Sequence, residues 1–196
     1  MDRVAAQESS HIMVMVHDSA GVPAAVLRRG EAEAGRMFRA AEIEIDWVNC
    51  AMSDSPGECR RFPGAKDFVL HIVPDGTTRS EMVFGESFLG EDGRGRYADV
   101  FFRRIESTAG EDIDISRLLA AVSAHELGHL LLGSGAHSPV GIMEPIWKHD
   151  SLRRIGMGTL LFTPQQCQLM RNRIGDDRTH LGLIRVANRS TLDDWF

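Results

Sequence analysis

The stretch HELGHLLLGSGAHSPVGIMEP, residues 125–145, places three histidines and a glutamate in a spacing suited to a metal site. Residues four apart on a helix lie one turn above each other on the same face, so His125 and His129 can direct two imidazoles at one ion. Catalytic zinc takes three protein ligands and keeps one position open. The stretch therefore predicts a helical zinc site in which Glu126, not a ligand, holds the zinc-bound water and takes its proton.

The third zinc ligand has to come from the segment that follows this helix. Gly133 and Gly135 are expected to end the helix and to let the chain turn back toward the metal, and His137 follows directly. We therefore predict His137 as the third ligand; its alternative role is that of a solvent-exposed loop histidine. The competing candidates for the third ligand are Glu144, His149 and Asp150.

At this point the stretch resembles a known family, the metzincin zinc peptidases. Their motif HExxHxxGxxH is followed by a methionine in a tight turn beneath the metal, and His125, Glu126 and His129 match its first half. The continuation HSPVGIMEP is similar to the matrixin version of the motif. The resemblance implies that Met143 is the turn methionine and that Pro145 trails it.

The chain departs from the family motif between the second histidine and the methionine. The family's glycine belongs at the position of Leu132, whereas here Gly133 follows one residue later, and His137 comes four residues after it rather than three. His137 then precedes Met143 by six residues, which is shorter than the matrixin spacing of eight. We therefore expect a loop of altered shape. Because Glu144 follows Met143, a tyrosine ligand in that turn is missing.

The rest of the chain predicts an α+β fold, and the resemblance implies a zincin or metzincin-like one. That fold has a mixed twisted sheet, an active-site helix and a small C-terminal helical subdomain. Residues 1–196 are expected to form a single catalytic domain, with an upper part of about 1–133 and a lower part of about 134–196. Strand character is predicted for residues 12–17, 43–48, 67–74 and 97–105, an exposed glycine-rich loop for 85–96, and helices for 24–41, about 114–133, 149–155 and 163–174.

The resemblance also suggests where a substrate would bind. Metzincins have an edge strand above the active-site helix, to which an extended peptide adds as a further strand. The candidate for that substrate edge strand is the run Tyr97, Ala98, Asp99 and Val100, with an ordinary sheet strand as the alternative.

Composition narrows the classes of partner. The chain has 196 residues, 43% hydrophobic content and a net charge of −6, which fits one well-cored domain and disfavours a nucleic-acid-binding surface. No apolar run approaches the ~20 residues of a membrane span.

The cysteines bear on the compartment of the protein. Cys50 and Cys59 flank a turn-rich loop and either form a disulfide or remain free thiols, whereas Cys167 is expected to be a buried apolar filler. A secreted or periplasmic location is favoured if a leader was removed, and a cytoplasmic one otherwise.

The sequence therefore predicts a zinc-dependent metallopeptidase, an endopeptidase that acts on peptide or protein substrates. Zn²⁺ is the expected cofactor, held by His125, His129 and His137, and Glu126 is the expected general base. Two alternatives stay open: a zinc-containing domain that binds peptides without cleaving them, and a zinc hydrolase of a non-peptide amide. The presence of Glu126 disfavours the first alternative, since a domain that only binds needs no base.

Overall fold

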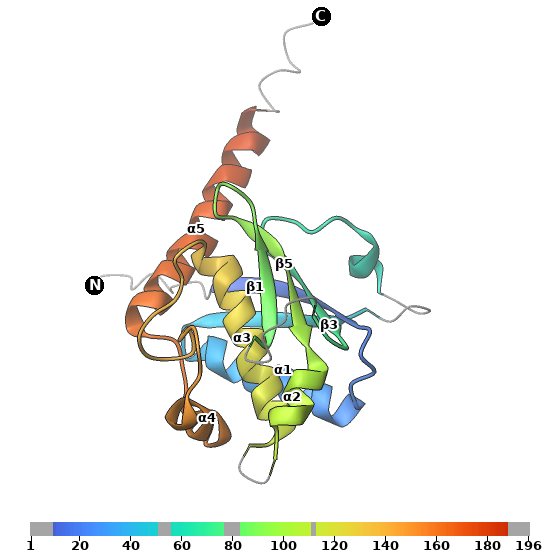
Figure 1. Ribbon diagram of the computed structural model, residues 1–196. Helices are drawn as coiled ribbons and strands as arrows, with labels where there is room; N and C mark the ends of the chain where they lie inside the picture. Colours follow the sequence, from blue (N-terminus) through green and yellow to red (C-terminus); the bar gives the residue numbers. More distant parts are fainter. Residues whose placement is uncertain (1–9, 51–55, 77–82, 111–112, 188–196) are drawn as a thin grey trace, which may run out of the picture.

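The computed structural model describes residues 10–50, 56–76, 83–110 and 113–187, with side chains described as far as residue 175. Its centre is a mixed sheet of five strands in the order β2-β1-β3-β5-β4 (Figure 1). The first four are mutually parallel, and β4 runs antiparallel to β5. The strands are β1 (Ser10–Asp18), β2 (Ile43–Asn49), β3 (Asp67–Val73), β4 (Gly85–Leu89) and β5 (Gly95–Phe101).

The helices connect these strands and follow them. They are α1 (Ala24–Arg39), α2 (Phe102–Thr108), α3 (Ile115–Leu132), α4 (His149–Gly156) and α5 (Pro164–Ala187), with a short 3₁₀ helix, η1, at Gly57–Arg60. Among the helices of the described residues, none combines the length and apolar character that crossing a bilayer requires.

One face of the sheet is covered by α1 and α3, which pack against each other as well as against the strands (Figure 1). The strand residues that point to these helices are buried and apolar, among them Val14 in β1, Leu70 and Ile72 in β3, and Val100 in β5. The alternation of strand side chains therefore places the main core between the sheet and the two helices. The helices α4 and α5 also contact α3.

The prediction for residues 85–105 was wrong about the loop, about which strand lies at the edge, and about where the last strand ends. The segment expected to be a glycine-rich loop contains β4, which forms a hairpin with β5. β5 itself is paired on both sides, with β3 and with β4, so the run Tyr97–Val100 is not an edge strand. Among the strands of the described residues, the one at this edge of the sheet is β4.

The strand predicted for residues 97–105 also ends earlier than expected, at Phe101, where α2 begins. Phe102 and Ile105 are buried at a spacing of three residues, which suits a helix that packs one face against the core. Arg104 holds the same turn in place, because its Nε donates to Asp75 over 2.7 Å and its Nη1 donates to the carbonyl of Val83 over 2.7 Å.

The helix that carries the histidine pair has the predicted ends. Asp114 caps α3, since its carboxylate accepts a hydrogen bond of 2.9 Å from the backbone N–H of Ser116. At the other end Gly133 has φ +81°, a left-handed conformation that favours glycine. The cap and the glycine fix where α3 begins and ends and hence on which turns its histidines lie.

The structure also resolves the cysteine alternatives. Cys50 and Cys59 form a disulfide, with their Cα atoms 5.7 Å apart. This bond ties the end of β2 to η1. Cys167 is free and half-buried against the main core, so it is less enclosed than expected.

Candidate metal centre

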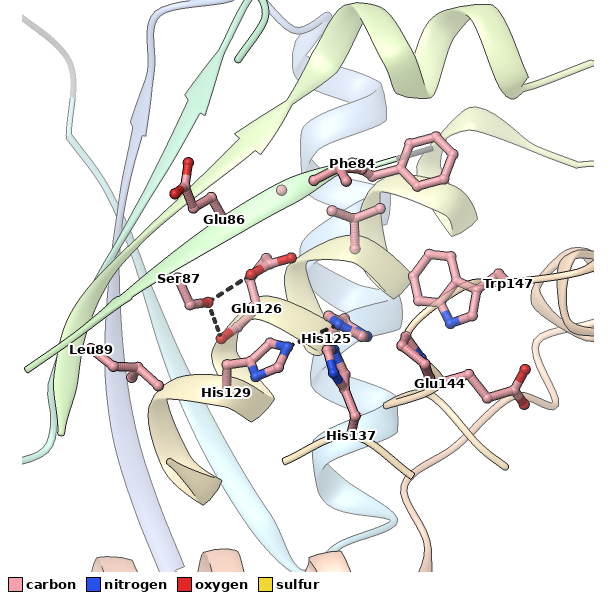
Figure 2. A pocket seen from close by; sticks show the side chains of 14 residues that line it. Phe84, Glu86, Ser87, Leu89, His125, Glu126, His129, His137, Glu144 and Trp147 are labelled. Atoms are coloured by element: carbon pink, nitrogen blue, oxygen red, sulfur yellow. Dashed lines mark hydrogen bonds between the residues drawn. The ribbon is translucent and has the colours of Figure 1, made fainter. Parts of the chain in front are cut away.

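The last turns of α3 present two imidazoles side by side. The Nε2 atoms of His125 and His129 lie 3.1 Å apart, and their ring centroids are separated by 4.8 Å. In Figure 2 the ring of His137 reaches the same place from the loop that follows the helix. One ligand atom from each of the three histidines lies within 4.8 Å of the others, which is a group that could hold a metal ion.

The donor chemistry of this group fits zinc. Two nitrogens that share a tetrahedral zinc at bond lengths of about 2.0–2.1 Å are about 3.4 Å apart, close to the separation of the His125 and His129 nitrogens. Burial lowers the pKa of both imidazoles from 6.5 to about 4, and His137 adds to the effect in each case. Both rings are therefore neutral near pH 7, the form in which imidazole binds metal.

His125 is oriented through its second ring nitrogen. Its Nδ1 lies 2.8 Å from the carbonyl oxygen of Ile142, to which it can donate, and this tautomer leaves Nε2 free for a metal. The same carbonyl accepts a hydrogen bond of 3.2 Å from the indole Nε1 of Trp147. The backbone N–H of Ile142 in turn donates to the carbonyl of Leu161 over 2.9 Å, so the accepting group is itself fixed.

Met143 lies against the helix between the two α3 histidines. Its side chain is fully buried, and a Cβ built at Gly128 would come within 2.6 Å of its sulfur. Only glycine at position 128 therefore lets the methionine pack this closely against α3. The resemblance to metzincins implied that Met143 is the turn methionine of that family, and this role stays a prediction.

The competing candidates for the third ligand lie elsewhere. The carboxylate of Glu144 points away from the histidines (Figure 2) and accepts hydrogen bonds from the Gly141 N–H at 3.1 Å and the Ser151 hydroxyl at 2.6 Å. Asp150 is exposed on α4 and pairs with Arg153 at 2.9 Å. His149 is exposed at the start of α4. Of the four candidates, the structure brings only His137 to the pair on α3.

Glu126 lies beside the histidines and is held by β4. The hydroxyl of Ser87 lies 2.6 Å from Oε2 of the Glu126 carboxylate and 2.9 Å from its backbone carbonyl oxygen, as drawn in Figure 2. A Cβ at Gly85 would lie 2.7 Å from Cγ of Glu126 and 2.7 Å from the carbonyl oxygen of Asp99. Glycine at position 85 therefore allows β4 to approach the Glu126 side chain, and Ser87 then orients its carboxylate.

Burial dominates the electrostatics of Glu126. It raises the pKa of this carboxyl from 4.5 to about 7; the Ser87 hydrogen bond opposes the rise and the nearby Glu86 carboxylate adds to it. In the metal-free protein, the Glu126 carboxyl therefore stays protonated in the folded state between about pH 4.5 and pH 7, where the same carboxyl in the unfolded state has lost its proton. Stability from this group is present below pH 4.5 and is lost as the pH rises through about 7.

We therefore expect the metal-free Glu126→Gln protein to be more stable than the wild type at pH 8, by up to about 3 kcal/mol, because glutamine carries no buried charge. At pH 4.5 the two proteins should be about equally stable. Urea unfolding in the presence of a chelator, with the disulfide intact, measures both differences. The control is Glu91→Gln, the same substitution at an exposed position on the hairpin turn, outside the cavity. A difference between Glu126→Gln and wild type that stays constant with pH would contradict the assignment.

These groups line a cavity of about 250 Å³ between β4, α3 and the segment around Met143. Phe84 and Trp147 stack at one end of it (Figure 2), with ring centroids 6.2 Å apart. Val122 adds a further apolar side chain to the lining. The histidines and Glu126 face the same space. The cavity thus combines an apolar wall with one group of metal-binding and acid–base side chains.

Comparison with known proteins bears on the fold. No protein-family model matches the sequence, and no curated protein matches it either. The structure is similar to archaemetzincin from Methanopyrus kandleri, with a TM-score of 0.53 and 18% sequence identity, over 87% of this chain and 99% of that one. The likeness establishes a shared fold. It agrees with the metzincin-like architecture that residues 125–145 predicted.

Two residues beside Glu126 went unnoticed in the sequence, Gly85 and Ser87, because their segment was interpreted as a loop. A signal for the correct structure is present, since Asp92-Gly93 is a dipeptide typical of β-hairpin turns. In the structure Gly93 has φ +69°, and the Gly90 N–H donates to the carbonyl of Arg94 over 2.8 Å across the turn. A hairpin assigned on that signal would have placed β4 at the edge of the sheet.

Proposed function

We propose that this protein is a zinc-dependent metallopeptidase in which His125, His129 and His137 hold the metal and Glu126 is the general base. The observation that carries the proposal is the convergence of three imidazoles and one oriented carboxylate in a single cavity. The fold shared with archaemetzincin supports it. Zinc in such a site supplies a Lewis acid that acidifies a water molecule and polarises a carbonyl group.

The chain's own residues account for the proton transfers. The Glu126 carboxylate takes the proton from the attacking water and then delivers it to the amine that leaves when the peptide bond breaks. Ser87 holds Oε2 of this carboxylate at 2.6 Å, so the group enters the reaction already oriented. The hydrogen bond from Nδ1 of His125 to the carbonyl of Ile142 holds the orientation of this ring during the proton transfers.

Strand β4 supports a peptide as the substrate rather than a small amide. Within the described residues, β4 pairs only with β5, so its outer edge offers unpaired backbone groups next to the cavity. An extended peptide can add to such an edge through main-chain hydrogen bonds. The edge strand above α3 is therefore β4, with Gly85–Leu89 in place of the run Tyr97–Val100. The apolar wall of Phe84, Trp147 and Val122 suits an apolar side chain of the substrate.

The direct test of the proposal is digestion of a mixed peptide library by the zinc-loaded protein, with the products identified by mass spectrometry. We expect internal cleavage of peptides, with an apolar residue enriched at one position beside the cleaved bond. Addition of a chelator should stop cleavage and zinc should restore it. Cleavage that survives removal of the metal, or a zinc-loaded protein that leaves the whole library intact, would contradict the proposal.

The orientation of Glu126 by β4 gives a separate prediction. Ser87→Ala should lower kcat by about 10- to 100-fold with little change in KM, because the base remains but its carboxylate loses the hydroxyl that orients it. Ser87→Thr keeps a hydroxyl and should recover most of the rate. Steady-state kinetics on one library-derived peptide measures both, and zinc affinity should be unchanged in either variant. Equal kcat values for wild type and Ser87→Ala would show that the hydroxyl does not position the base.

A further inference from the structure

A buried glutamine from a distant helix contacts the chain on both sides of His137. Gln166 lies in the first turn of α5, and only 6% of its surface is exposed. Its side-chain Nε2 donates to the hydroxyl of Ser138 over 2.9 Å and to the backbone carbonyl of Ala136 over 3.3 Å. One amide group thus links α5 to the two residues that flank His137.

The oxygen of the same side-chain amide, Oε1, accepts a hydrogen bond at the start of α5. The backbone N–H of Thr163 donates to Oε1 of Gln166 over 2.9 Å, and the backbone N–H of Gln166 donates to the Thr163 hydroxyl over 3.3 Å. This reciprocal pair is a capping box at the start of α5. Because Oε1 is taken by Thr163, the NH₂ group has to face the His137 loop. The orientation of the amide is therefore set by the cap.

The loop needs such a contact. His137 is itself exposed, and the turn before it contains Gly135 at φ +81°. The chain from the second histidine to His137 is also longer than in the metzincin motif, and a longer, glycine-containing loop has more conformations available to it. The ring of His137 can bind together with His125 and His129 only in those conformations that bring it to the pair.

We propose that Gln166 is the positioning residue for the third ligand: it fixes the loop on α5 so that His137 meets the histidine pair before metal binds. This inference rests on the proposed zinc site. The expected effect follows from preorganisation, since the apparent affinity falls by the fraction of molecules in which the loop is competent to bind. Loss of an outer partner of a metal ligand typically lowers metal affinity by about 10- to 100-fold.

Gln166→Glu separates this role from the capping role. Glutamate keeps an oxygen for the Thr163 N–H and is itself a capping-box residue, but it has no N–H to donate to the Ala136 carbonyl. It can keep a contact to Ser138 only if that hydroxyl turns away from the Val140 carbonyl, to which it now donates over 2.8 Å. Its added negative charge would by itself attract a cation, so a loss of affinity cannot arise from charge alone. Gln165→Glu is the matched control, because it makes the same substitution one residue earlier on an exposed position.

The test measures zinc affinity by competition with a chromophoric chelator, together with the thermal unfolding of each metal-free protein. We expect Gln166→Glu to bind zinc about 10- to 100-fold more weakly than wild type and, because its carboxylate is buried, to unfold cooperatively at a lower Tm, and we expect Gln165→Glu to bind like wild type. If wild type and Gln165→Glu bind tightly and Gln166→Glu binds equally well, the positioning role is refuted while the metal site stands. If wild type binds no zinc, the metal centre fails, and this inference with it.

Ser138→Ala changes the other partner of the same contact, on the loop. It tests the inference even if Gln166→Glu does not fold. This variant removes one of the two acceptors of the Gln166 amide, together with the hydrogen bond from Ser138 to the Val140 carbonyl, and should weaken zinc binding by less than Gln166→Glu does. In the double variant, the two effects should combine less than additively, because both remove one shared contact. Wild-type zinc affinity in Ser138→Ala, or additive losses in the double variant, would overturn the inference.

Discussion

Replacement of Glu126 by glutamine is expected to remove most of the peptide hydrolysis while zinc remains bound. Glutamine is nearly the same size and can still contact Ser87, but it cannot take a proton from water. General-base catalysis typically contributes about 10²- to 10⁴-fold, so kcat should fall by about that factor. The metal ligands are untouched, and zinc affinity should stay close to that of the wild type.

The measurement for Glu126→Gln pairs peptide cleavage with zinc content on the same preparation. Glu144→Gln is the matched control, because the Glu144 carboxylate points away from the histidines and contacts Gly141 and Ser151 instead. It should retain most of the activity. If Glu126→Gln kept more than about a tenth of the wild-type kcat, another group would have to be the base. If Glu144→Gln lost as much activity as Glu126→Gln, the roles of the two carboxylates would be misassigned.

Replacement of His137 by alanine is expected to lower zinc affinity by more than about 100-fold, because loss of a direct ligand exceeds the effect of losing an outer partner. Hydrolysis should disappear at zinc concentrations that saturate the wild type. The histidine pair on α3 is preserved, so a weak two-ligand site would remain. Chelator competition measures the affinities of the variant and of the wild type under the same conditions.

His149→Ala is the control for the loss of an imidazole from this part of the chain. His149 was one of the competing candidates for the third ligand, and it is exposed at the start of α4, outside the histidine cluster. Its removal should leave zinc affinity unchanged. A large loss of affinity in His149→Ala together with a small one in His137→Ala would show that the lower segment rearranges on metal binding and supplies a different ligand.

Much of the fold was predictable from local sequence. The helix predicted for about 114–133 is observed as α3, and the signals at its two ends are local: Asp114 is a residue type that caps helices, and Gly133 suits the turn that ends one. The sequence of β3 is nearly continuously apolar, which is typical of a strand covered on both sides, and the structure places this strand at the centre of the sheet.

The hairpin over the site was not predicted, for a reason connected with the proposed function. On the inner face of β4, Gly85 and Ser87 contact Glu126, and Leu89 is the apolar residue of that face. One apolar residue in three is a weak form of the alternation by which half-buried strands are usually identified. A site that departs from local sequence patterns in this way is a common feature of functional regions. The contacts of Gln166 with the His137 loop were not predicted either, because its partners Ser138 and Ala136 lie 28 and 30 residues away in sequence.

The decisive measurement is a crystal structure of the zinc-soaked protein with anomalous diffraction recorded on both sides of the zinc absorption edge. The account predicts one strong peak between α3 and the loop that follows it, bonded to one nitrogen each of His125, His129 and His137 at about 2.0–2.1 Å. Glu126 should face the open coordination position without binding the ion. A peak bound by Glu144, His149 or Asp150 in place of His137, or no peak at the histidine cluster, would contradict the central claim.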